Sequence, residues 1–112
     1  MSIVSVTEPP RRFKKTLVYY YMPHCPYCKE FEPVFMDMVK SCKRMKSCSI
    51  SAVDITKHRD LGVSVKSVPT VMYFDSQGMP HKMSANSSEE RTLEHLGSFL
   101  VEQYKEDVTR NR

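Results

Sequence analysis

The apolar positions of the chain recur with the period of a strand and then with the period of a helix. An unbroken aromatic and β-branched run, Leu17 to Tyr21, predicts a strand that is buried on both of its faces. From about Pro26 to Met45 the apolar residues recur at helical spacing, so we expect a helix there, with a kink at Pro33. The first half of the chain therefore predicts a strand that leads into a long helix.

The second half of the chain predicts three more strands and a final helix. A capping-box pattern, Ser87 followed by Glu90, predicts that this helix begins at Ser87. The order strand–helix–strand–helix–strand–strand–helix predicts an α/β fold, with a central mixed sheet flanked by helices on both faces. The expected strands are 49–54, 70–74 and 81–83, with a short helix or turn near 57–61.

Length and composition indicate one globular domain. The chain has 112 residues, of which 40% are hydrophobic and 27% charged, and this balance excludes full disorder. We expect a single domain over 1–112, with a core of about 17–104, an N-terminal segment 1–16 and a C-terminal tail 105–112. The longest apolar run, Leu17 to Met22, is far too short to cross a bilayer, so no membrane partner is expected.

Charge and glycine placement exclude further classes of partner. The net charge of +4 is a mild excess that we interpret as solvated surface, because no RNA-binding or zinc-finger pattern accompanies it. The three glycines lie far apart and cannot form a phosphate-binding loop, so no cofactor is expected. No charged leader with an apolar segment is visible at the start, so we expect a cytoplasmic location. We also expect a monomer, and the mild charge excess predicts no nucleic-acid partner.

The segment Cys25-Pro26-Tyr27-Cys28 is the most informative part of the chain. It lies between the buried strand and the long helix, the setting in which a C-x-x-C pair forms a redox site. At the helix N-terminus, unpaired N–H groups and the helix dipole favour a Cys25 thiolate and can lower the thiol pKa from about 8.5. Cys25 is therefore the expected nucleophile, and the more shielded Cys28 is expected to resolve the mixed disulfide.

The segment from Tyr20 to Pro33 resembles the active-site segment of the thioredoxin superfamily. The shared features are the aromatic strand, the cysteine pair, the Lys that follows it and the proline inside the helix. Val68-Pro69-Thr70 resembles the cis-proline loop of the family. The resemblance covers about residues 17–104 and implies a thioredoxin fold, with the family's first helix expected to be missing, and a thiol–disulfide oxidoreductase.

The resemblance also implies substrate contacts and partners. Val68 and Pro69 are expected to present their backbone to an extended substrate segment, and His24, Tyr27 and Met22 are expected beside it. Protein disulfides are the implied substrates. An external thiol reductant, either the thioredoxin reductase or the glutathione system, is the implied electron source. Reduction is the expected direction, because no secretion signal is seen and cytosolic dithiols stay reduced.

The surroundings of the cysteines depart from the family pattern. His24 stands where the family has a Trp, and Tyr19 stands where most members carry a buried carboxylate, six positions before the first cysteine. A tyrosine with a pKa near 10 is a poor base at neutral pH, so we expect Cys28 to lose its proton slowly, to His24 or to water. The Pro26-Tyr27 dipeptide is that of glutaredoxins, although other glutathione-binding features are absent.

Several alternatives remain open on the sequence alone. The function could instead be that of a glutathione-linked, glutaredoxin-like reductase, or of a non-catalytic thioredoxin-fold module that binds a protein partner. Cys42 and Cys48 are expected to be two buried small side chains, with a second disulfide or a four-cysteine zinc site as alternatives. The histidines outside the cysteine segment, His58, His81 and His95, are expected to be surface residues.

Overall fold

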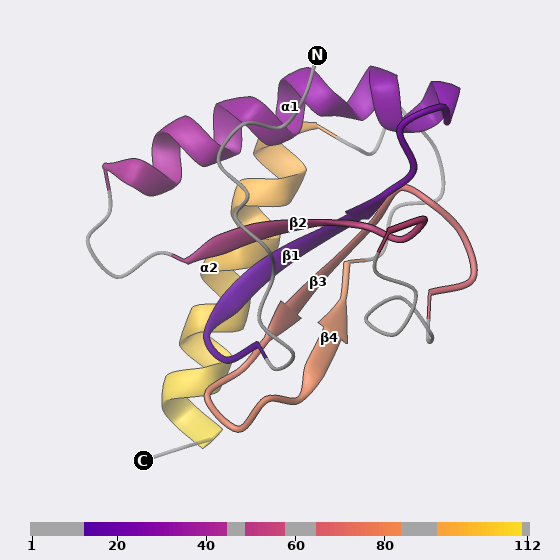
Figure 1. Ribbon diagram of the computed structural model, residues 1–112. Helices are drawn as coiled ribbons and strands as arrows, with labels where there is room; N and C mark the ends of the chain where they lie inside the picture. The colour runs from indigo at the N-terminus through magenta and orange to yellow at the C-terminus, as the bar shows by residue number, and fades with distance from the viewer. Residues whose placement is uncertain (1–12, 45–48, 58–64, 84–91, 111–112) are drawn as a thin grey trace.

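The computed structural model describes residues 13–44, 49–57, 65–83 and 92–110, and the structural statements below refer to these ranges. Four strands and two helices follow one another along the described chain (Figure 1). In order they are β1 (Thr16–Tyr21), α1 (Pro26–Lys43), β2 (Ile50–Asp54), β3 (Thr70–Phe74), β4 (Pro80–Lys82) and α2 (Leu93–Arg110).

The strands form one mixed sheet in the order β2-β1-β3-β4. β1 is parallel to β2 and antiparallel to β3, and β4 runs antiparallel to β3. As an inner strand, β1 is covered on both faces, which explains its unbroken apolar sequence. Tyr20 of β1 lies opposite Thr70 of β3, so the end of the first strand is adjacent to the start of the third. The mixed sheet is as expected from the sequence.

The two faces of the sheet carry separate apolar cores. Leu17 and Tyr19 of β1 point to one face and pack against both helices, which cross where Gly97 of α2 lies over Met38 of α1. The opposite face carries a second core made by Phe13, Val18, Tyr20, Val53 and Met72. We expected helices on both faces; in the described part of the chain, both helices cover the same face.

The C-terminal helix differs most from expectation. α2 begins at Leu93, where the Thr92 hydroxyl accepts a hydrogen bond from the His95 N–H at 3.1 Å, as an N-cap side chain does. The expected start at Ser87 lies outside the described residues. At its other end the helix continues to Arg110, through residues that we assigned to a tail. Neither α1 nor α2 is long and apolar enough to span a membrane.

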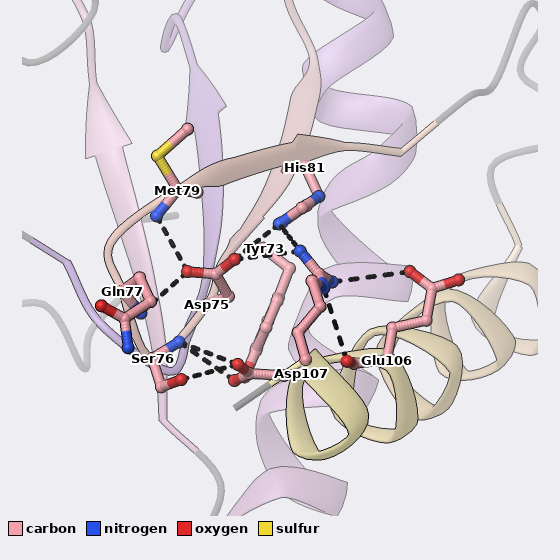
Figure 2. Close-up of polar contacts among 9 residues, drawn as sticks. Tyr73, Asp75, Ser76, Gln77, Met79, His81, Glu106 and Asp107 are labelled. Atoms are coloured by element: carbon pink, nitrogen blue, oxygen red, sulfur yellow. Dashed lines mark hydrogen bonds and ion pairs between the residues drawn. The ribbon is translucent and has the colours of Figure 1, made fainter. Parts of the chain in front are cut away.

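A buried polar cluster joins the β3–β4 turn to the end of α2 (Figure 2). The Asp75 carboxylate accepts hydrogen bonds from the backbone N–H groups of Gln77 and Met79, at 2.9 and 3.0 Å. One of its oxygens also lies 2.9 Å from His81 Nε2 and 3.1 Å from an Arg110 nitrogen. His81, which we expected to be an ordinary surface residue, is therefore part of a polar cluster with Asp75 and Arg110.

Asp107 of α2 makes a second set of contacts in the same cluster (Figure 2). It is buried and accepts hydrogen bonds from the Ser76 N–H and hydroxyl groups, and from the Tyr73 hydroxyl at 3.1 Å. The end of α2 is thus hydrogen-bonded to the β3–β4 turn and to β3 itself. This anchoring explains why residues 105–110 belong to α2 rather than to a tail.

Candidate redox site

Cys25 lies at the junction between β1 and α1. A turn after the strand is closed by a hydrogen bond from the Cys25 N–H to the Met22 carbonyl at 3.2 Å. Cys25 is the N-cap residue of α1, and Pro26 is the first helical residue, a position that needs no N–H donor. The half-buried thiol of Cys25 therefore lies at the end of the helix where negative charge is favoured.

Cys28 lies one turn inside α1, with a thiol that is buried rather than exposed. Its side chain is 3% exposed, and this burial raises the pKa of the Cys28 thiol to about 11. A backbone hydrogen bond from Met22 and a hydrogen bond with Tyr19 act in the opposite direction, but burial outweighs them. Cys28 and Cys25 are both thiols and lie within hydrogen-bonding distance of each other.

The loop before β3 reaches the same place from another part of the chain. Its Val68 carbonyl oxygen lies 3.8 Å from the Cys25 sulfur, and the Val68–Pro69 peptide bond is cis. The pairing of Tyr20 with Thr70 fixes this proximity, because it holds the start of β3 next to the end of β1. The structure therefore brings together the cysteine pair and the Val68-Pro69 loop.

The other residues predicted for the site differ in their exposure. Met22 and Tyr27 are exposed by 38% and 59%, which is high for apolar side chains and leaves both available to a partner. His24 is also exposed. An exposed His24 and a buried Cys28 face different environments, which argues against His24 as the base for the resolving thiol.

Tyr19 fills the core behind the cysteine pair. Its ring packs against Phe31 and Phe35 at centroid distances of 5.2 and 4.6 Å, and its hydroxyl donates to the Cys28 carbonyl at 3.3 Å. Burial, together with the nearby thiol of Cys28, raises the pKa of Tyr19 far above its ordinary value. Tyr19 therefore stays protonated and orients Cys28 rather than acting as its base.

Glu32 is a residue near the site that we did not predict from the sequence. Its Oε1 atom is buried and has no hydrogen-bond partner among the residues that the structure describes. A signal for it exists in the sequence, since Glu32 follows Cys28 by four residues and so lies on the same face of α1.

Cys42 forms a disulfide, which the sequence analysis held only as an alternative. Cys48, the partner considered there, lies outside the described residues. No group of three or more metal-ligating side chains occurs within 13–44, 49–57, 65–83 and 92–110. The interpretation of Cys42 as a simple buried side chain is therefore wrong.

We expect Cys25 to react with iodoacetamide at pH 7 at least about 100-fold faster than Cys28. Cys28 is buried and, with a pKa of about 11, holds little thiolate at that pH, whereas Cys25 is half-buried at the helix end. Mass spectrometry of peptides from timed, quenched reactions measures both rates. Equal labelling, or a preference for Cys28, contradicts the assignment of Cys25 as nucleophile.

Comparisons with known proteins agree with this geometry. The family model described as Thioredoxin matches residues 8–102. Protein disulfide-isomerase A4 of Bos taurus is 33% identical over 91 residues, and protein disulfide-isomerase tigA of Aspergillus niger is 31% identical over 93. Each alignment covers 80% of this chain, but only 14% and 25% of those relatives.

The similar solved structures extend the match to three dimensions. The J-Trx1 fragment of ERdj5 superposes with a TM-score of 0.66 at 25% identity, and the match covers 78% of this chain and 41% of that one. The thioredoxin fold expected from the cysteine segment is thereby confirmed.

The expectation of a cytoplasmic location is wrong. The relatives are protein disulfide-isomerases, a class typical of the lumen of the endoplasmic reticulum, and ERdj5 is among the structural neighbours. The disulfide at Cys42 also suits an oxidising environment. Because the alignment covers only 14% of the relative's length, the first residues of this chain are not evidence for a cellular location. Reduction was expected because of a cytoplasmic location, so it is no longer favoured over oxidation.

Proposed function

The chain belongs to the thioredoxin family, and from this premise we propose that it is a thiol–disulfide oxidoreductase that acts on protein disulfides. Cys25 is the nucleophile and Cys28 the resolving residue. The observation that carries the proposal is the placement of the Cys25 thiol at the N-terminus of α1, with a buried second thiol behind it and the Val68 carbonyl 3.8 Å away.

The reaction proceeds in two exchanges that conserve electrons. The Cys25 thiolate attacks one sulfur of a substrate disulfide, forms a mixed disulfide and expels the other substrate sulfur as a thiolate. Cys28 then loses its proton and attacks the Cys25 sulfur. The Cys25–Cys28 disulfide forms, the second substrate thiolate leaves, and two electrons have passed to the substrate. The reverse sequence oxidises a substrate dithiol.

A substrate reaches Cys25 along the Val68-Pro69 loop. An extended peptide laid beside this loop pairs with its backbone, and the 3.8 Å contact between Val68 and Cys25 then brings the substrate disulfide next to the nucleophile. Met22 and Tyr27 give this surface an exposed apolar border, and His24 adds a polar group. Specificity for unfolded or extended segments follows from backbone pairing of this kind.

The domain, residues 1–112, acts as a monomer and returns to its starting state by exchange with an external thiol. A couple of the thioredoxin reductase or glutathione type supplies the electrons for reduction. The direction of flow is set by the reduction potential of the Cys25–Cys28 pair against that couple.

Insulin reduction tests the proposed function. With dithiothreitol as the electron source, the protein is expected to bring forward the precipitation of the insulin B chain well beyond the reagent alone, as followed by turbidity. A Cys25→Ser variant, which keeps every other thiol, is expected to fall back to the reagent rate. Turbidity no faster than the reagent with the unaltered protein would contradict the proposal and favour a binding module.

A further inference from the structure

Glu32, a half-buried residue with one buried carboxylate oxygen, lies on the same face of α1 as the resolving thiol. Glu32 follows Cys28 by four residues, and side chains at this spacing are neighbours on a helix surface. Glu32 Oε1 is shielded from solvent, yet it accepts no hydrogen bond from any part of the chain that the structure describes. Leaving a buried acceptor unsatisfied costs about 1–3 kcal/mol, so a donor that reaches this oxygen forms a hydrogen bond that the described chain does not otherwise supply.

The charge of Glu32 acts on Tyr19 and Tyr21 of β1. The pKa of Tyr19 is raised chiefly by burial and by Cys28, and the negative charge of Glu32 adds to the effect. The pKa of Tyr21 is raised by burial, by Asp54 and again by Glu32. The carboxylate therefore lies near both phenols of β1, and the Tyr19 hydroxyl is the group that contacts Cys28.

The second exchange needs a proton acceptor. Burial is the largest cause of the raised pKa of the Cys28 thiol, and it does not require a free Cys25 thiol, so little of Cys28 is ionised at pH 7, although the thiolate is the attacking species. The hydroxyl of Tyr19 is protonated and cannot accept this proton, and His24 is exposed whereas Cys28 is buried.

We propose that Glu32 accepts the proton of the Cys28 thiol when the mixed disulfide is resolved. This inference rests on the proposed function, since it concerns the second exchange of that reaction. The Cys28 S–H bond breaks as its proton passes to the Glu32 carboxylate. The resulting thiolate bonds to the Cys25 sulfur, and the bond from Cys25 to the substrate sulfur breaks. The proton on Glu32 then returns to solvent or to the departing thiolate.

A role as proton acceptor and a purely electrostatic role predict opposite effects. If Glu32 acted only through its charge, neutralising it would remove a repulsion and favour the Cys28 thiolate, so the second exchange would become faster. If Glu32 accepts the proton, the same substitution makes the second exchange slower. The other ionisable groups that face this region, Tyr19, Tyr21 and Asp54, are unchanged in both cases, and Cys25 is held in the mixed disulfide.

Stopped-flow reaction with 5,5′-dithiobis(2-nitrobenzoic acid) measures the two exchanges separately. The first release of the coloured thiolate reports attack by Cys25, and its rate scales with reagent concentration. The second release reports resolution by Cys28 and does not scale. Glu32→Gln is expected to keep the first rate and to slow the second by about 100-fold at pH 7, the usual lower range for loss of a general base.

The pH profile and a matched control complete the experiment. In Glu32→Gln the second rate is expected to rise about tenfold per pH unit between pH 6 and 9, as hydroxide replaces the lost acceptor, whereas the unaltered protein shows a flatter profile. Glu30→Gln, which removes an exposed carboxylate from the same helix, is expected to change neither rate. Glu32→Asp, which keeps the carboxylate one methylene shorter, is expected to give an intermediate second rate.

The outcomes separate this inference from the proposed function. A normal first phase with an unchanged or faster second phase in Glu32→Gln would overturn the role of Glu32 alone. An equal slowing in Glu30→Gln would overturn it as well. A missing first phase in the unaltered protein would contradict the nucleophile, and with it both proposals.

Discussion

Replacing Cys28 with serine is expected to convert the protein into a trap for its substrates. Cys25 keeps its place at the helix N-terminus and still attacks a substrate disulfide, but a serine hydroxyl cannot displace the substrate from Cys25. Without added thiol, the mixed disulfide is expected to persist for hours instead of seconds, a lengthening of about 1000-fold or more. Non-reducing electrophoresis of the variant mixed with a disulfide-containing protein measures the adduct.

The matched control for the trap is Cys25→Ser. That variant keeps a buried thiol of low reactivity and is expected to form little adduct under the same conditions. Adducts must disappear on addition of dithiothreitol, which shows that they are disulfides. Equal trapping by both variants would mean that the two cysteines do not divide the work as the geometry indicates.

Replacing Asp75 with asparagine is expected to give the largest loss of stability of any single polar substitution considered. Asp75 accepts two backbone hydrogen bonds and contacts both His81 and Arg110 while its side chain is 3% exposed. An asparagine has an NH₂ group in place of one carboxylate oxygen, and this group would face either the backbone N–H groups or His81 and Arg110 without accepting a hydrogen bond from them. We therefore expect the free energy of unfolding to fall by about 2–4 kcal/mol at pH 7. Urea denaturation measures the change.

The loss at Asp75 is expected to depend on pH with a defined sign. Burial raises the pKa of Asp75, but the hydrogen bonds from His81, Met79 and Gln77 outweigh it, and the net pKa is lower than usual. A lowered pKa in the folded state stabilises the fold above the unfolded pKa of about 3.9, and the stabilisation is lost as the pH falls through the folded value. The difference between the unaltered protein and Asp75→Asn is therefore expected to shrink below about pH 4.

Glu106, whose carboxylate forms a surface ion pair with Arg110, provides the control for Asp75. Glu106 is exposed and lies 3.6 Å from Arg110, so Glu106→Gln is expected to change the free energy of unfolding by less than about 0.5 kcal/mol. A loss of similar size in both variants would show that the net charge of this region matters more than the buried contacts of Asp75.

The elements around the redox site could be predicted from the sequence because their signals are local. The apolar run that became β1 and the helical spacing that became α1 are each read within twenty residues. The C-x-x-C pair lies between them, so its place at the helix N-terminus follows from the two elements. The bounds of β3, Thr70–Phe74, also match the expectation. The site residues other than the cysteines came from resemblance, and the roles of all the site residues, Cys25 and Cys28 included, remain predictions.

The features that were missed depend on long-range packing. Arg110 and Asp75 are 35 positions apart, and nothing in the local pattern pairs them or marks residues 105–110 as anchored. A charged residue in an amphipathic helix is usually expected to face solvent, and Glu32 would be predicted to do so. Its buried oxygen becomes evident only when α1 is packed on β1. Thr92 and Ser87 are both residue types favoured at a helix N-cap, so the sequence alone does not predict which of them caps α2.

The pairing of Tyr20 with Thr70 makes the site sensitive to strand register. The nucleophile follows β1 and the Val68-Pro69 loop precedes β3, so their 3.8 Å contact depends on how the two strands align. A slip of one residue would displace the loop by about 3.3 Å and reverse the facing of every β3 side chain. A partly folded chain with α1 formed but β3 unpaired would hold a reactive thiol without a surface that guides substrates to it. Selective exchange, as distinct from mere thiol reactivity, is therefore a property that arises only when the sheet is complete.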